Sequence, residues 1–420
     1  MRVLILSQYY DPEPIPKPGE LAAALRERGH EVSVITGLPN YPAGRLYPGA
    51  RLALLKRERI DGIPVTRTFE LPYHGRWAAG RILNYASFMI SAALAALVTA
   101  PCDVIYVWHP PLTVGVAAAA IGRIKRAPVV YDVQDIWPES AVLSGVLRDG
   151  SLVRLMSRLE RLVYRLVDHI LVVTPGARDN LIGKGVPAAK LTVLPHWIDE
   201  SLFGAVSPDD AAAVRATYGW RDRFVVLFAG NLGLVQGLET VVRAAECLRH
   251  ETGILWAFVG DGVDRARLEQ LVAERGLGGS VQFIDRQPLT AMPAFFAAAD
   301  VLLVHLKRSE LSNYIIPSKT NAYLATGRPI LMAMEGAAAD LVRQAKAGVV
   351  VGSDDPEALA AAALALRAMP EADRARFGES GRRFLLEHLS KARVLGDYEA
   401  LLARVMADRT AGRERSAPAS

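Results

Sequence analysis

The chain has 420 residues, a formal net charge of +5 and two cysteines, and 51% of its residues are hydrophobic. Its length favours two domains over one. Two cysteines exclude a disulfide framework and favour a reducing compartment. The modest positive charge suits an anionic small molecule or membrane headgroups, and we expect no nucleic-acid partner. Because Met1 leads directly into an apolar run, we expect no cleaved signal peptide and a cytoplasmic location.

Short continuous apolar runs recur along the chain with helical patterns between them. In the first half they cover residues 3–6, 32–35, 104–107, 129–131 and 170–173. In the second half they cover residues 224–229, 255–259, 281–284, 301–304, 329–332 and 349–351. Runs of this kind are typical of parallel strands covered on both faces. The pattern predicts an α/β protein with two doubly wound, Rossmann-like domains.

The strong runs stop between residues 199 and 218 and restart near 221, which places the domain boundary. We expect an N-terminal domain over 1–196 and a C-terminal domain over 197–385. A helix is predicted over 386–407, and the polar tail over 408–420 is predicted to be disordered.

Residues 82–102 contain no charged side chain and are bounded by Arg81 and Asp103. The segment is long enough to span a bilayer, but its many alanines and polar residues give a weak hydrophobic signal. Arg76, Trp77 and Arg81 form a basic, aromatic approach to it. We therefore expect a helix that is buried or lies on a membrane surface, with peripheral membrane contact.

Polar residues follow several predicted strands of the first half, at the edge where doubly wound sheets bind ligands. His109 follows the run 104–107 and either reaches a substrate or is structural. Asp132 and Asp135 follow the run 129–131 and either act as a base, bind sugar hydroxyls or cap a helix. Gly19 ends a Pro-rich loop after the first strand, which either closes over a substrate or is a plain connector.

The loops of the second half suit a phosphate. Gly230, Gly233 and Gly237 keep the backbone slim ahead of a helix, as a close approach to phosphate requires. The spacing is neither a GxGxxG fingerprint nor a Walker loop, which disfavours a nicotinamide or ATP site. Asp261 and Arg286 follow the next two runs, and Arg286 is suited to stack on a base or to stay solvated.

The segment 303–332 is the strongest candidate anion site. It reads as a strand, a polar loop and a helix that opens at Pro317-Ser318-Lys319 and ends at Gly327. Backbone N–H groups at a helix start attract anions, and the Lys319 charge stands beside them. No HExxH, Cys/His metal spacing or GxSxG elbow occurs, so we predict no metal site and no cofactor.

Five segments carry a family resemblance: RGHEVSVITGLPNYPAGRLYPG, DVQDIWPES, FAGNLGLVQGLET, FVGDG and PSKTNAYLATGRPIL. Together they resemble the large retaining glycosyltransferase family of sucrose-phosphate synthase and bacterial mannosyltransferases. The narrower resemblance is to colanic-acid and O-antigen sugar transferases such as the L-fucosamine transferases. It implies a GT-B fold, two domains facing across a cleft with a C-terminal helix crossing back, and metal-independent transfer. The first domain would bind the acceptor and the second a nucleotide-sugar donor.

Three departures from the family pattern stand out. Asn231 and Gln236 occupy the places of an Arg and a Lys that bind the diphosphate. Tyr314 and Ala322 occupy the places of two glutamates, the second of which holds the ribose. His196-Trp197 replaces an Asn-Gly. Glu310 and Asn313 are the nearby polar residues that we consider as substitutes for the acidic pair.

The leading hypothesis is transfer of a sugar, most simply from a UDP-sugar, to a lipid-linked or polysaccharide acceptor at the inner face of a bacterial membrane. Candidate catalytic residues are His109, Asp132 and Asp135. Candidate donor contacts are Gly19, Gly230, Asn231, Gly233, Gln236, Gly237, Asp261, Arg286, Glu310, Asn313, Ser318 and Lys319. The alternatives are a secondary-metabolite glycosyltransferase with a soluble acceptor, a non-hydrolysing sugar-nucleotide epimerase, and an inactive partner in a membrane assembly.

Overall fold

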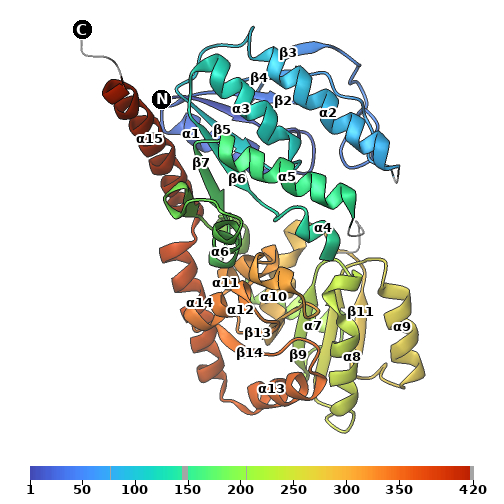
Figure 1. Cartoon of the computed structure of the whole chain (residues 1–420). Coiled ribbons are helices and arrows are strands. Elements are labelled where there is room, and N and C mark those ends of the chain that lie inside the picture. The colour runs from blue at the N-terminus through green and yellow to red at the C-terminus, as the bar shows by residue number, and fades with distance from the viewer. Residues whose placement is uncertain (76, 144–149, 205, 417–420) are drawn as a thin grey trace. The chain divides into compact units, whose positions relative to one another are not determined.

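The protein folds as two compact units, shown as a computed structural model in Figure 1. Unit 1 is Met1–Leu194 together with Leu395–Ser420, and unit 2 is Pro195–Val394. The structure describes residues 1–75, 77–143, 150–204 and 206–416, so Arg76 of the basic approach lies outside the described residues. The sequence had placed the boundary between 196 and 197.

Unit 1 is built on an eight-stranded sheet in the order β3-β4-β2-β1-β5-β6-β7-β8, parallel except for the β3–β4 pair. Its strands are β1 (Arg2–Leu6), β2 (Glu31–Thr36), β3 (Leu55–Ile60), β4 (Ile63–Thr68), β5 (Val104–Trp108), β6 (Val129–Val133), β7 (His169–Val172) and β8 (Leu191–Val193). Its helices include α1 (Lys17–Glu27), α2 (Ala78–Ala95), α3 (Thr113–Lys125), α4 (Glu139–Leu143), α5 (Ser151–Leu166), α6 (Pro175–Gly183) and the short η1 (Ala188–Lys190).

The apolar runs of the first half all form strands of this sheet, but the sequence missed β3, β4 and β8. Strand β3 carries the charged sequence LKRERI because it is the edge strand, where charged side chains face solvent. Strand β4 contains Pro64 and Arg67, which interrupt its apolar pattern. Strand β8 has only three residues.

Unit 2 is built on a six-stranded, fully parallel sheet in the order β11-β10-β9-β12-β13-β14. Its strands are β9 (Phe224–Ala229), β10 (Ile254–Val259), β11 (Val281–Ile284), β12 (Val301–His305), β13 (Ile330–Ala333) and β14 (Gly348–Val351). Its helices are α7 (Pro208–Thr217), α8 (Leu238–Cys247), α9 (Arg265–Glu274), α10 (Met292–Ala298), α11 (Ser318–Thr326), α12 (Ala337–Gln344), α13 (Pro356–Ala368) and α14 (Glu371–His388), with the short η2 (Glu200–Phe203), η3 (Leu234–Gln236), η4 (Leu289–Ala291) and η5 (Glu310–Asn313).

Both faces of the unit 2 sheet are covered, as the continuous apolar strands predicted. Alternate residues of β9 belong to different cores. Val225 and Leu227 lie in one apolar cluster, and Val226 and Phe228 lie in the other. The prediction of a doubly wound α/β architecture is confirmed.

The C-terminal segment differs from the prediction. The expected helix over 386–407 is divided, because α14 ends at His388 and α15 (Lys391–Ser416) begins three residues later. Ser390 forms a parallel bridge with Ile198, and the Lys391 amide donates to Glu200 Oε2 at 3.0 Å. Helix α15 continues to Ser416, where we had expected a disordered tail from 408. Residues 408–416 include one alanine, one glutamate and three arginines, which are good helix formers and account for the difference.

Within the described residues, no helix is long and apolar enough to cross a membrane.

Candidate functional site

The loops that follow β9 and β10 touch through their backbones. The Leu232 amide donates to Asp261 O at 2.8 Å. A Cβ placed on Gly260 would lie 2.0 Å from Gly230 O, and one on Gly262 would lie 2.4 Å from Leu232 O. Gly260 also has a φ of +147°, which L side chains rarely adopt. The glycines therefore allow a contact between two loops that any side chain would separate.

The Lys319 side chain of α11 lies at the end of β9, beside the loop that follows it. Its Nζ donates to Gln236 Oε1 at 3.0 Å and lies 3.6 Å from the centroid of the Phe228 ring. A Cβ on Gly230 would approach the same Nζ to 3.4 Å. The predicted neighbourhood of Lys319, Gln236 and Gly230 is therefore present in unit 2, with the ammonium at the end of β9.

The surroundings of Lys319 contain no carboxylate partner for its ammonium among the described contacts. Burial lowers the pKa of Lys319 from its usual range to about 7. An ammonium held over an aromatic face and a neutral amide has lost hydration without gaining a counter-charge. Binding an anion at this position would supply that charge.

Helix α11 is fastened to the end of β9. The Tyr323 hydroxyl accepts from the Ala229 amide at 3.0 Å and is fully buried. The Asn321 side chain donates to His196 O at 3.1 Å. Pro317 stands at the N-cap, and no side chain caps the helix start. The amides of this first turn are therefore not blocked by a side-chain cap.

His305 is a part of the site that the sequence did not indicate. It ends β12, is fully buried, and its Nδ1 lies 2.6 Å from Gln236 O. Because a carbonyl only accepts, Nδ1 carries the proton. Nε2 is buried without a hydrogen-bond partner among the described residues. Burial lowers the pKa of His305, which favours the neutral form of the ring. It supports the turn at Gly237, whose added Cβ would lie 3.0 Å from the imidazole.

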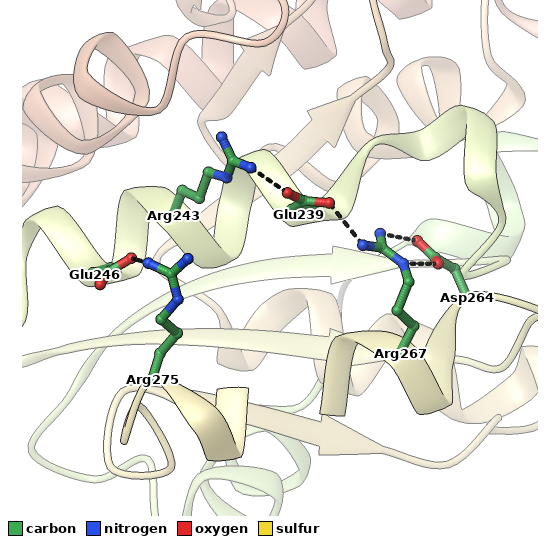
Figure 2. A network of polar contacts seen from close by, with 6 residues as sticks. All are labelled: Glu239, Arg243, Glu246, Asp264, Arg267 and Arg275. Carbon is green, nitrogen blue, oxygen red and sulfur yellow. Dashed lines mark hydrogen bonds and ion pairs between the residues drawn. The ribbon is translucent and has the colours of Figure 1, made fainter. Parts of the chain in front are cut away.

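A network of ion pairs braces the start of α8 against α9 (Figure 2). Glu239 contacts Arg243 at 2.5 Å and Arg267 at 2.7 Å. Arg267 also holds the buried Asp264 through two bonds of 2.6 and 3.0 Å. Bonding from Arg267 lowers the pKa of Glu239 and Asp264. Arg243 and Arg267 are thus paired with carboxylates. They do not replace the Arg and Lys that the family pattern has at the positions of Asn231 and Gln236.

Most of the remaining predicted donor residues of unit 2 are exposed. Arg286, Glu310, Asn313 and Ser318 are exposed, and so are Asn231 and Asp261. Gly233 is buried, and a Cβ there would lie 2.8 Å from the Asn231 amide nitrogen.

No carboxylate stands at the two positions of the acidic pair. Ala322 packs against the apolar core of unit 2, and Tyr314 follows the short η5. Glu310 begins η5 and is exposed. The arrangement offers no acidic side chain in the body of α11 for a ribose.

Asp132 of unit 1 is buried near the carboxyl end of β6. Its carboxylate accepts from Tyr106 at 2.5 Å, Gln134 at 2.7 Å and Tyr398 at 3.1 Å. Burial raises the pKa of Asp132 to about 6, against the lowering effect of these bonds. Tyr398 comes from α15, so the far end of the chain closes over this carboxylate. The geometry gives Asp132 a structural position, which is the alternative to a base or a sugar contact.

His109 and Asp135 differ in exposure. His109 is 1% exposed, its ring lies edge-on to Tyr131 at 5.7 Å, and burial lowers its pKa to about 3. Its Nδ1 has no hydrogen-bond partner among the described residues. Asp135 is half-buried, and burial raises its pKa. Gly19 lies in the first turn of α1 in unit 1, where a Cβ would be 2.6 Å from Asp11 Oδ2.

No group of three His, Cys, Asp or Glu side chains within the described residues is placed to hold a metal ion.

Comparison with known proteins decides the family. Residues 18–197 match the sequence model of the Glycosyl transferase 4-like domain, and residues 212–384 match that of Glycosyl transferases group 1. The chain belongs to the group 1 glycosyltransferases. It is a nucleotide-sugar glycosyltransferase, as the resemblance in the sequence implied.

Two relatives show how broad this family is. The chain is 29% identical to a colanic acid biosynthesis glycosyl transferase, WcaI, of Escherichia coli, over 78% of this chain and 82% of that protein. It is 26% identical to a GDP-mannose-dependent phosphatidylinositol monomannoside mannosyltransferase of Mycolicibacterium smegmatis, over 67% of this chain and 79% of that protein.

Solved structures confirm the GT-B fold of this glycosyltransferase. Anabaena Alr3699/HepE in complex with UDP superposes with a TM-score of 0.72 at 18% identity, covering 96% of this chain and all of that one. Sucrose-phosphate synthase of Thermosynechococcus elongatus gives a TM-score of 0.74 at 18% identity, covering 97% of this chain and all of that one. At such identities the likeness concerns the fold alone.

Proposed function

We propose that this glycosyltransferase moves a sugar from a UDP-sugar to a lipid-linked or polysaccharide acceptor during the assembly of a bacterial surface glycan. Transfer is metal-independent and retains the configuration at the anomeric carbon. Unit 2 holds the donor and unit 1 the acceptor. The relation to WcaI supports the glycan class, and the branch of colanic-acid and O-antigen transferases supplies the expectation of a lipid-linked acceptor.

The observation that carries the proposal is the Lys319 ammonium at the glycine loops. Its Nζ lies beside Gly230 and the Gln236 amide, and no described carboxylate contacts it. A diphosphate at this position accepts from the ammonium and from amides at the start of α11. In a partly buried site such bonds are stronger than in water. Lys319 thereby supplies the charge that Asn231 and Gln236 do not.

The same contact acts on the chemical step. The bond between the anomeric carbon and the diphosphate oxygen breaks, and negative charge grows on the leaving diphosphate. A fixed cation at that oxygen stabilises the transition state more than the bound donor. The acceptor hydroxyl forms the new glycosidic bond and its proton passes to the diphosphate. His109 and Asp135 remain the candidates in unit 1 for contacts with the acceptor or the transferred sugar.

A thermal-unfolding screen tests the donor assignment. UDP, GDP, dTDP and their sugars are added separately, and UDP compounds are expected to stabilise the protein most. At a concentration 100 times Kd, a ligand that binds only the folded state stabilises it by about 2.7 kcal/mol. Lys319→Met should remove most of that shift. Stabilisation by GDP compounds alone would replace the UDP assignment.

Product analysis separates transfer from its alternatives. A transferase releases UDP and labels the acceptor only when the acceptor is present. An epimerase releases UDP without an acceptor. An inactive assembly partner, the reading favoured by Ala322 and Tyr314 at the positions of the acidic pair, shows neither product nor stabilisation by any nucleotide.

A further inference from the structure

Helix α2 has an apolar outward face. Its exposed residues, within the part that is described, are Ala79, Ile82, Leu83, Ile90 and Leu94, and none is polar. The four larger side chains are 50–61% exposed. The apolar row extends beyond the helix in both directions, to Trp77, Leu97 and Val98. A soluble surface rarely shows so long an apolar row without a partner.

Helix α5 has a basic outward face. Arg154, Arg158, Arg161 and Arg165 are all exposed and follow the four-three-four spacing of one helix face. None of them has an ion-pair partner among the described residues. Exposed leucines at 155 and 162 stand beside the arginines, and the opposite face of the helix carries the buried Val163 and Tyr164.

The two helices belong to one face of unit 1. Helix α3 packs against both α2 and α5, so the three lie side by side over the sheet (Figure 1). Their described sequences contain a single acidic residue, Glu160, and it is 1% exposed. We call the exposed residues of α2 and α5 the α2–α5 face. It combines an apolar row with unpaired positive charge and has no exposed carboxylate.

We infer that the α2–α5 face docks on the surface of a bilayer with anionic headgroups. The apolar row of α2 enters the boundary between headgroups and acyl chains, and the arginines of α5 contact lipid phosphates. The acyl chains of a bilayer need no hydrogen bonds from the apolar row of α2. A protein partner would usually surround such a row with polar, hydrogen-bonding groups. The inference concerns binding to lipid and stands independently of the donor chemistry.

Co-sedimentation with lipid vesicles tests the inference on the full chain without donor or acceptor. We expect binding to vesicles that contain phosphatidylglycerol, and much weaker binding to pure phosphatidylcholine. Binding should weaken from 0.1 to 0.5 M salt, because exposed charges are screened. Equal binding to both vesicle types, or none to either, would overturn the inference.

Three double variants test whether the arginines of α5 bind the vesicles. Arg158→Gln with Arg161→Gln should lower the partition coefficient on anionic vesicles about 25-fold, at roughly fivefold for each arginine near the surface. Arg158→Lys with Arg161→Lys should retain binding. Arg221→Gln with Arg383→Gln, two exposed arginines of unit 2, is the charge-matched control and should also retain it.

Ile90→Gln with Leu94→Gln should lower the partition coefficient about tenfold or more, because half-exposed side chains lose their burial in lipid. Val263→Gln with Leu289→Gln, exposed by 85% and 65% in unit 2, is the matched control. All four replaced side chains are exposed, so folding is retained. If the α2 and α5 variants bind vesicles like the parent, the inference is wrong. If they abolish only self-association of the protein without lipid, the face binds a second copy instead.

Discussion

The carboxyl edges of the two sheets look alike in sequence and differ in structure. In both, polar residues follow apolar strands. In unit 1, Asp132 is enclosed by Tyr106, Gln134 and Tyr398. In unit 2, the partners of Lys319 among the described residues are the Gln236 amide and the Phe228 ring. The difference lies in what covers each carboxyl edge: a segment from the far end of the chain covers Asp132, and the glycine-containing loop after β9 borders Lys319. A polar residue at a strand end therefore marks a ligand site only when its own partners leave it unsatisfied.

Removing the Lys319 charge should have the largest effect. Lys319→Met keeps the packing on Phe228 but places no charge at the glycine loops. We expect kcat/KM for the nucleotide-sugar to fall about 100-fold or more, the size seen when a donor that stabilises developing charge is lost. The Tm in the absence of ligand should not fall, because a partly desolvated amine is replaced by an apolar side chain.

Lys346→Met is the matched control, because Lys346 is an exposed lysine of the same unit outside the loops. It should leave steady-state kinetics unchanged. Unaltered kinetics in Lys319→Met would show that the diphosphate binds elsewhere. The carboxyl edge of the unit 2 sheet at Lys319 would then not be the donor site.

Asp132→Asn should instead reduce stability. An amide cannot accept all three hydrogen bonds that the carboxylate accepts, so the free energy of unfolding should fall by about 2 kcal/mol. Chemical denaturation measures this loss. Donor binding, followed by calorimetry, should be unchanged. Loss of activity at full stability would return Asp132 to the catalytic candidates.

The pH dependence of the same variant gives a second measurement. Burial raises the pKa of Asp132 to about 6, above its ordinary value. A raised folded-state pKa gives stability that is present at low pH and is lost as pH rises through 6. The difference in unfolding free energy between the parent and Asp132→Asn should therefore be larger at pH 5 than at pH 7.5. Equal differences at both pH values would contradict the burial of this carboxylate.

The sequence predicted the fold well because buried parallel strands form continuous apolar runs. It missed β3 and β4, where edge exposure and Pro64 disturb the pattern. It also missed the break between α14 and α15. Both segments consist of good helix formers, and the interruption at Ser390 depends on the bridge to Ile198, which is remote in sequence.

The donor half of the site was predictable in part. Glycines and a lysine at a helix start carry a local signal for phosphate, and the structure gathers Gly230, Gln236 and Lys319. His305 directly follows the run 301–304, so the strand-end signal that singled out His109 could have found it as well. Tyr323 gave no signal, because a tyrosine inside a helix resembles an ordinary core residue. The enclosure of Asp132 could not be foreseen, since its partner Tyr398 lies 266 positions away in the sequence.

Gly260→Ala should separate the two loops of unit 2. The new Cβ would lie 2.0 Å from Gly230 O at a φ of +147°, so the backbone must move. We expect the Kd for UDP to rise about tenfold, since a displacement of this kind costs on the order of 1–3 kcal/mol. Gly276→Ala is the matched control, because its φ is +66° and nothing lies within 4 Å of the added Cβ. It should lose stability through strain but keep its affinity for UDP.

The smallest effect is a proton taken up when the nucleotide-sugar binds. Burial lowers the pKa of Lys319 to about 7, and a bound diphosphate raises it again. The empty site is then about half protonated at pH 7, and affinity should fall roughly fivefold from pH 7 to pH 8. Calorimetry in two buffers of different ionisation enthalpy counts the protons that are taken up on binding.

A nucleotide-sugar is the proper ligand for this measurement, because its phosphates are diesters. A terminal phosphate titrates near pH 6 and would add its own protons. Lys319→Met should bind without proton uptake. Uptake that persists in this variant would assign the proton to another group and leave Lys319 charged in the empty site.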